Sequence, residues 1–220
     1  PDATLPYQYD GAIAEPSFAL RGFHEHTQHP IVMSDIYLRP EADFRPYVSR
    51  YLKWSARNRQ NVVSWHLLKT VDLDTWLPYI ESVIDEAEGY GIQVGMVTSF
   101  VDQQQNNFRI IVAEDEGDEA QIRTVVERFI ETGFSFLTFQ IGSSEFTKPA
   151  DADVLRWLNL VASDYADQID LYAWIHTTCD LETDEGGYFY HLPGETDEAL
   201  GAWLHTTMYY DLENPAPVYS

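Results

Sequence analysis

Two kinds of hydrophobic pattern alternate along the chain. Short apolar runs are separated by longer stretches in which apolar residues recur every three or four positions. The first pattern is typical of buried strands, and the second is typical of helices that bury one face. The predicted strands are residues 18–26, 61–68, 92–100, 134–141, 169–176 and 199–209. The predicted helices are residues 43–57, 72–90, 118–132 and 151–165.

The clearest helix covers residues 72–90. Acidic residues lead into it and Gly91 ends it, as expected for the two ends of a helix. Residues 179–198 contrast with it, because they are acidic and Gly-rich with only a weak helical pattern, and we expect a long loop there. The apolar positions that define the buried face of residues 72–90 are Leu73, Trp76, Leu77, Ile80, Val83, Ile84 and Ala87.

Regular alternation of strands and helices predicts an α/β fold with a parallel sheet inside helices. A closed barrel and an open doubly wound sheet both fit. Gly89, Gly91 and Gly95 lie at a helix-to-strand turn, which is the wrong context for a dinucleotide-binding loop. Polar residues gather at the C-terminal ends of the strands, which favours a TIM-type (β/α) barrel.

Six predicted strands make this barrel incomplete, because a complete one needs eight. We expect residues 1–17 to be an irregular lead-in segment and residues 18–220 to form the barrel domain, truncated at its C-terminus. Further residues, or another chain, would complete it.

Five of the seven histidines lie at the ends of predicted strands. Alternate residues of a strand share a face, so His24 and His26 point the same way while Phe23 and Glu25 point the other way. Strand ends of a parallel barrel meet at one rim, so the sequence predicts a site there. Imidazole binds sugar hydroxyls, moves protons or ligates metals. The five histidines are His24, His26, His66, His176 and His205.

A glycoside hydrolase is the first functional hypothesis. Such enzymes use two carboxyl groups, one as the acid and one as the nucleophile or base. Glu145 follows the fourth strand, where many sugar-cleaving barrels carry the acid, although Ser144 stands where they usually have Asn. Asp211 follows the sixth strand and is the second candidate. The five histidines, Trp65 and Tyr210 would bind the sugar, and no cofactor is needed.

Two alternatives stay open. His24, His26, His176 and His205 resemble the metal ligands of the amidohydrolase barrels, with Glu145 in the place of their ligand after strand four. Four imidazoles would bind a divalent metal such as zinc and lower the pKa of a bound water. The second alternative is a non-catalytic barrel module that binds glycans or serves a structural role.

The amino-acid composition limits the classes of partner that the chain is expected to bind. With 13 Lys and Arg against 36 Asp and Glu, the formal net charge is −23, which repels nucleic acid and anionic membranes. No apolar run approaches the roughly 20 residues of a membrane span. Cys179 is the lone cysteine and forms no internal disulfide. The chain begins with Pro1 and not with Met, so we expect either that a leader was removed, as in a secreted or periplasmic protein, or that the chain was trimmed. A carbohydrate or another small polar molecule is the expected partner.

Several sequence strings resemble a group of large bacterial (β/α)-barrel proteins related to glycoside hydrolases. The strings are RGFHEHTQHP at 21–30, RNRQNV at 57–62, SEFT at 144–147, HTTMYYDL at 205–212 and PAPVY at 215–219. The resemblance spans about residues 18–219. It implies a barrel fold and a sugar-related function, and proteins of that group continue well past this point.

Overall fold

The fold is an incomplete (β/α) barrel. The computed structural model describes residues 16, 18–28, 32–40, 42–102, 106–112, 116–142, 148–176, 182–198 and 200–205. Within them, six strands form one sheet in chain order, and every neighbouring pair is parallel. The fold class predicted from the sequence is therefore confirmed. The strands are β1 (Gly22–Glu25), β2 (Val62–His66), β3 (Gln93–Ser99), β4 (Phe136–Gln140), β5 (Asp170–His176) and β6 (Gly201–His205).

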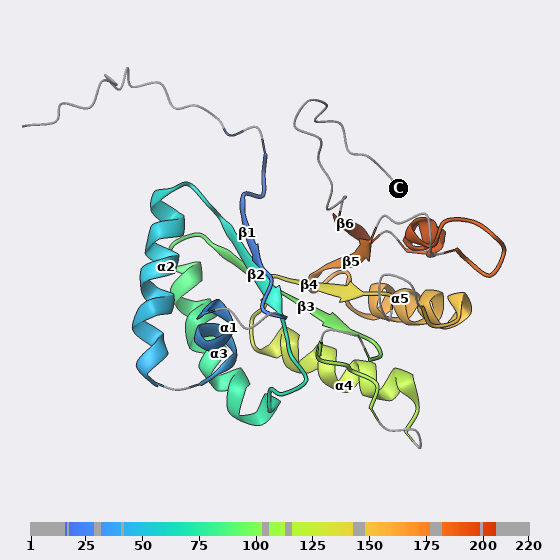
Figure 1. Cartoon of the computed structure of the whole chain (residues 1–220), viewed down its shortest axis with the longest axis horizontal. Helices are drawn as coiled ribbons and strands as arrows, with labels where there is room; N and C mark the ends of the chain where they lie inside the picture. Colours follow the sequence, from blue (N-terminus) through green and yellow to red (C-terminus); the bar gives the residue numbers. More distant parts are fainter. Residues whose placement is uncertain are drawn as a thin grey trace, which may run out of the picture.

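Helices lie around the outside of the curled sheet (Figure 1). Two short helices were not predicted: α1, and the 3-10 helix η2 inside the expected long loop. Both have seven residues, which is too short for a repeated three-and-four spacing to show in the sequence. The helical elements are α1 (Val32–Leu38), η1 (Ala42–Phe44), α2 (Arg45–Arg57), α3 (Leu73–Glu88), α4 (Asp118–Glu131), α5 (Asp151–Tyr165) and η2 (Phe189–Glu195).

Helix α3 shows how local sequence sets an element. The side chain of Asp72 accepts a hydrogen bond from the backbone N–H of Thr75 at 3.0 Å, which caps the first turn. All seven apolar positions of the predicted face are buried. The indole of Trp76 also donates to the carbonyl of Tyr37 at 2.7 Å, so α3 is fixed to α1. Gly91 follows the helix with φ +70°, a conformation that favours glycine.

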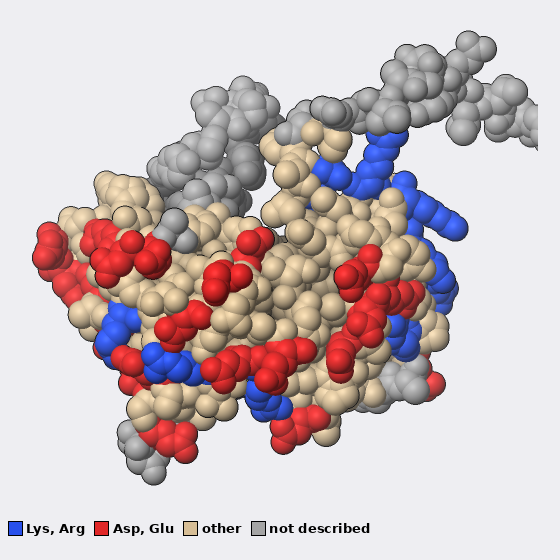
Figure 2. Space-filling view, turned by 180° about the vertical axis from the view of Figure 1, so that it is seen from behind, with Lys and Arg blue, Asp and Glu red and all other residues tan. Residues whose placement is uncertain are grey.

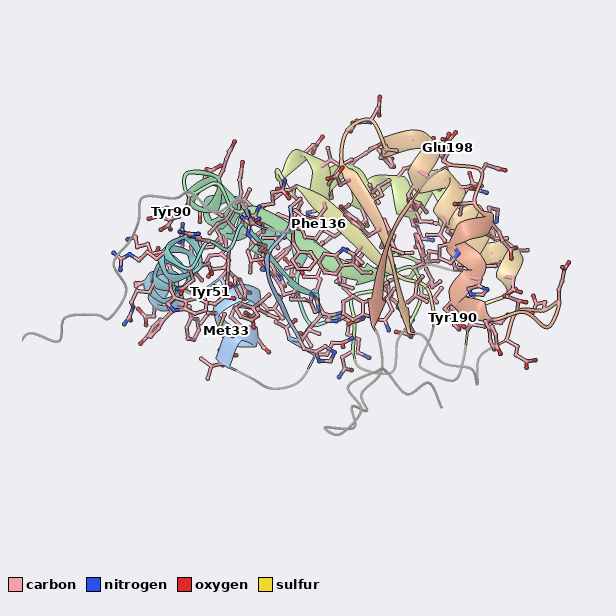
Figure 3. All side chains as sticks on the ribbon, turned by 90° about the horizontal axis from the view of Figure 1, so that it is seen from above. Met33, Tyr51, Tyr90, Phe136, Tyr190 and Glu198 are labelled. Carbon is pink, nitrogen blue, oxygen red and sulfur yellow. The ribbon has the colours of Figure 1, made fainter. Side chains whose placement is uncertain are left out.

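The two faces of the sheet have different contents. The outer face and the helices share one large hydrophobic core. The inner, concave face carries large aromatic rings: Phe136 lies 5.8 Å from Tyr172 and 5.3 Å from Trp203, between ring centroids. Figure 3 shows Phe136 among the strands and Tyr51 on the helical side. The concave face is therefore filled by side chains at its base, as in a barrel rather than a pore.

Gly95 makes room for one of these rings. A β-carbon added at Gly95 would lie 2.0 Å from a ring carbon of Phe136, the register partner of Gly95 on β4. We therefore expect Gly95→Ala to lower the free energy of unfolding by about 1–3 kcal/mol, through overpacking. Urea denaturation measures this. Gly194→Ala is the control, because no atom lies within 4 Å of its added β-carbon. Equal stability of the two variants would contradict the packing described for Gly95.

Many of the acidic residues lie on the helices. Figure 2 shows Asp and Glu side chains spread over one face of the molecule, with some Lys and Arg side chains among them and others along one edge. Some acids are paired, as in Arg45 with Glu86 (2.5 Å) and Arg123 with Asp164 (2.7 Å). Surface pairs that solvent still reaches, as both of these do, add little stability. Within the described ranges, no helix has the length and apolarity that a membrane crossing requires.

Candidate functional site

Three histidine rings meet at the C-terminal ends of β1 and β2. The ring of His66 lies 4.6 Å from that of His24 and 5.0 Å from that of His26, and the rings of His24 and His26 are 6.4 Å apart. Nδ1 of His24 is 2.8 Å from Oγ of Ser64, which fixes the orientation of the imidazole. We call His24, His26 and His66 the histidine cluster. It brings together three of the five predicted histidines.

Two tryptophans extend the cluster across the curl of the sheet. The ring of Trp174 on β5 lies 4.7 Å from His24 and 5.1 Å from His66. Trp203 on β6 lies 5.9 Å from His24 and 6.2 Å from Trp174. β1 and β5 are separated by three strands in the sheet, so strong curvature is needed for this contact. Side chains from β1, β2, β5 and β6 therefore meet at one site on the rim of the incomplete barrel.

A buried polar network lies beside these rings. Asn107, which is fully buried, donates through Nδ2 to Oγ of Ser99 (3.1 Å) and to Oε1 of Gln140 (2.5 Å). Nε2 of Gln28 donates to Oδ1 of the same Asn107. Gln28 follows β1, whereas Ser99 and Gln140 end β3 and β4. The network thus joins three strand ends through one loop residue.

Backbone hydrogen bonds hold Asn107 in place. The N–H of Phe108 donates to the carbonyl of Leu67 (2.7 Å), and the carbonyl of Phe108 accepts from Ser99 (3.0 Å). Ile110 donates to the carbonyl of Ser99 (2.9 Å). The loop after β3 therefore packs between the ends of β2 and β3. Sequence reasoning missed Asn107 because the loop has no hydrophobic period, and its QQQNN string is typical of any polar loop.

The outer face of β1 has a structural role. The hydroxyl of Tyr51 on α2 donates to Glu25 at 2.5 Å, and Phe23 stacks on Trp54 of the same helix at 6.1 Å. Burial, together with the hydrogen bond to Glu25, raises the pKa of Tyr51 above its ordinary value. These contacts confirm that Phe23 and Glu25 face away from His24.

Trp65 does not fit its predicted role in sugar binding. Its side chain is 0% exposed and stacks on Tyr37 of α1 at 4.4 Å, with the rings inclined by 8°. The ring belongs to the core between the sheet and the helices. Adjacent strand residues face opposite sides, so His66 points to the concave face and Trp65 cannot. We therefore exclude Trp65 from the site.

Several predicted residues lie outside the described residues. Glu145, Tyr210 and Asp211 are among them, as are the side chains of His176 and His205. The backbones of His176 and His205 are register partners at the ends of β5 and β6. The metal hypothesis depends on these two side chains. In the described part of the chain, no group of three His, Cys, Asp or Glu residues has an arrangement that would hold a metal ion.

Solved structures share this fold. No protein-family model matches the chain, and no curated protein matches it. An O-GlcNAc hydrolase of Thermobaculum terrenum superposes with a TM-score of 0.53 at 14% identity, over 84% of this chain and 40% of that one. A β-hexosaminidase of Streptomyces plicatus, in complex with the product GlcNAc, superposes with a TM-score of 0.54 at 12% identity, over 90% of this chain and 44% of that one. An exo-β-N-acetylglucosaminidase of Vibrio harveyi superposes with a TM-score of 0.50 at 12% identity, over 73% of this chain and 36% of that one.

These likenesses concern the fold. The chain spans less than half the length of each of these three proteins. The predicted resemblance to barrel proteins related to glycoside hydrolases is confirmed at this level.

Proposed function

We propose that this chain is part of a carbohydrate-active hydrolase of the glycoside hydrolase type. The observation that carries the proposal is the meeting of the histidine cluster with Trp174 and Trp203 on the concave face, at the C-terminal strand ends of an incomplete barrel. Active sites of (β/α) barrels lie at this end. The fold likeness to an O-GlcNAc hydrolase and a β-hexosaminidase supports the same reading.

The side chains of the site suit a sugar. Sugars combine hydroxyl groups with apolar C–H faces, so they bind to hydrogen-bonding groups placed next to aromatic rings. His24, His26 and Trp203 are partly exposed and are the groups that would touch the ligand. His66 is 1% exposed and Trp174 is 8% exposed, so they would form the floor beneath it.

The chemistry is assigned to the two carboxyl groups predicted from the sequence. Glu145, which follows β4 along the chain, would donate a proton to the leaving glycosidic oxygen as that bond breaks. Asp211, which follows β6, would either attack the anomeric carbon or activate the water that does so. Tyr210, His176 and His205 would complete the sugar contacts. We infer these roles from positions along the chain.

The test is sugar binding by the intact protein. We expect calorimetric titration with N-acetylglucosamine to show binding, and His24→Gln to weaken it by about tenfold, because the imidazole ring that packs against His66 and Trp174 is lost. His191→Gln is the matched control, since His191 lies on η2 among Tyr188 and Tyr190, and its affinity should stay unchanged.

Other outcomes would contradict the proposal. If neither N-acetylglucosamine nor any sugar of a glycan array bound, the concave face would not be a sugar site. If sugar turnover were absent and purification without chelator returned one equivalent of zinc, the metal-dependent alternative would replace it.

A further inference from the structure

In the polar network beside the histidine cluster, the hydrogen bonds fix which end of each side-chain amide faces which partner. The Oδ1 atom of Asn107 accepts from Gln28, so its Nδ2 atom is the end that faces Ser99 and Gln140. An amide donates through nitrogen and accepts through oxygen. Gln140 therefore turns Oε1 toward Asn107, and its Nε2 atom must point away from it. The hydrogen bonds of Asn107 thus decide which end of the Gln140 amide is available.

The Nε2 atom of Gln140 remains available within the described part of the chain, where it donates no hydrogen bond. It is also absent from the buried polar atoms that lack a partner there, so it is not sealed from solvent. By contrast, Oγ of Thr138, two residues earlier on the same face, is one of those buried atoms. An amide group whose acceptor end is occupied and whose nitrogen is not sealed from solvent is suited to donating to a ligand.

Gln140 also lies in the site described above. Its register partners are Ser99 on β3 and Trp174 on β5, so its side chain shares the concave face with both. Trp174 in turn contacts His24 and His66. Gln140 is 8% exposed, which limits its movement and favours a single orientation of the amide.

We propose that Gln140 is a substrate-binding residue whose Nε2 donates to an acceptor oxygen of the sugar, and that Asn107 is the positioning residue that orients it. This inference rests on the proposed function. It assigns a specificity: the site favours a hydroxyl, ether or carbonyl oxygen next to Trp174. An ammonium group has no lone pair and is disfavoured there. The donor is oriented before the ligand arrives, so binding does not have to order it.

The first experiment removes the donor and keeps the shape. In Gln140→Glu, a carboxylate oxygen still accepts from Asn107, but the N–H groups are gone. We expect the affinity of the intact protein for N-acetylglucosamine to fall by roughly tenfold. Gln168→Glu, at an exposed position after α5, introduces the same charge and should change the affinity less than twofold.

The second experiment tests the positioning role of Asn107. Gln140→Ala is made in the natural protein and in an Asn107→Ala background, and the loss of affinity is compared. If Asn107 acts through Gln140, the second loss is much smaller than the first. A purely structural Asn107 would lower the melting temperature but leave the two losses equal.

The outcomes separate this inference from the proposed function. A natural protein that binds no sugar overturns both. If the natural protein and the Gln140→Glu variant bind N-acetylglucosamine equally tightly, the role of Gln140 is overturned and the proposed function is not. Additive losses in the double-mutant cycle overturn the role of Asn107.

Discussion

Glu145→Gln is expected to slow hydrolysis of an alkyl glycoside by about 10²- to 10⁴-fold, because the leaving alkoxide then departs without a proton from a general acid. A dinitrophenyl glycoside of the same sugar has a leaving group that departs without protonation, so its hydrolysis should slow far less. The comparison of kcat for the two substrates measures the role of the carboxyl group in proton transfer.

The control for Glu145 is Glu182→Gln, which removes a carboxylate from an exposed loop position before η2. Its turnover should match that of the natural protein for both substrates. Equal slowing of both substrates by Glu145→Gln would indicate a role other than general acid, and unchanged turnover would remove Glu145 from the mechanism.

The largest effect on stability is expected at Trp65. Trp65→Ala removes a fully buried indole that stacks on Tyr37 and lies 6.4 Å from Phe134. We expect the free energy of unfolding in urea to fall by about 3–5 kcal/mol, from lost burial and the remaining cavity. That is a large part of the stability of an ordinary domain.

A milder substitution tests where Trp65 lies. Trp65→Phe keeps an aromatic ring in the core, so the protein should stay folded and bind N-acetylglucosamine with unchanged affinity. A weakening as large as that of His24→Gln would contradict the position of Trp65 on the helical side of the sheet.

The alternation of apolar patterns was sufficient to predict the sheet, four of its helices and its parallel order. It also predicted the face of His24, because residue parity in a strand is a strict geometric rule. The same rule, applied to β2, would have placed Trp65 on the other face of the sheet from His66. Applied to β5 and β6, it would have added Trp174 and Trp203, which lie two residues before His176 and His205 on the same rows.

The polar network is a different case. Asn107 reaches the site from a loop, and its position depends on hydrogen bonds to Leu67 and Ser99 that form after the strands are in place. Neither a period nor a motif marks such a residue in a single sequence. Tertiary contacts alone select it from the neighbouring polar residues.

The contact between His24 and Trp174 joins residues 174 − 24 = 150 positions apart. Closing so long a loop costs chain entropy before any contact is gained, and folds dominated by distant contacts are slow to form. During synthesis, the first strand must wait for the fifth to leave the ribosome. Ligand binding by a refolding chain would therefore recover late, after most of its helices have formed.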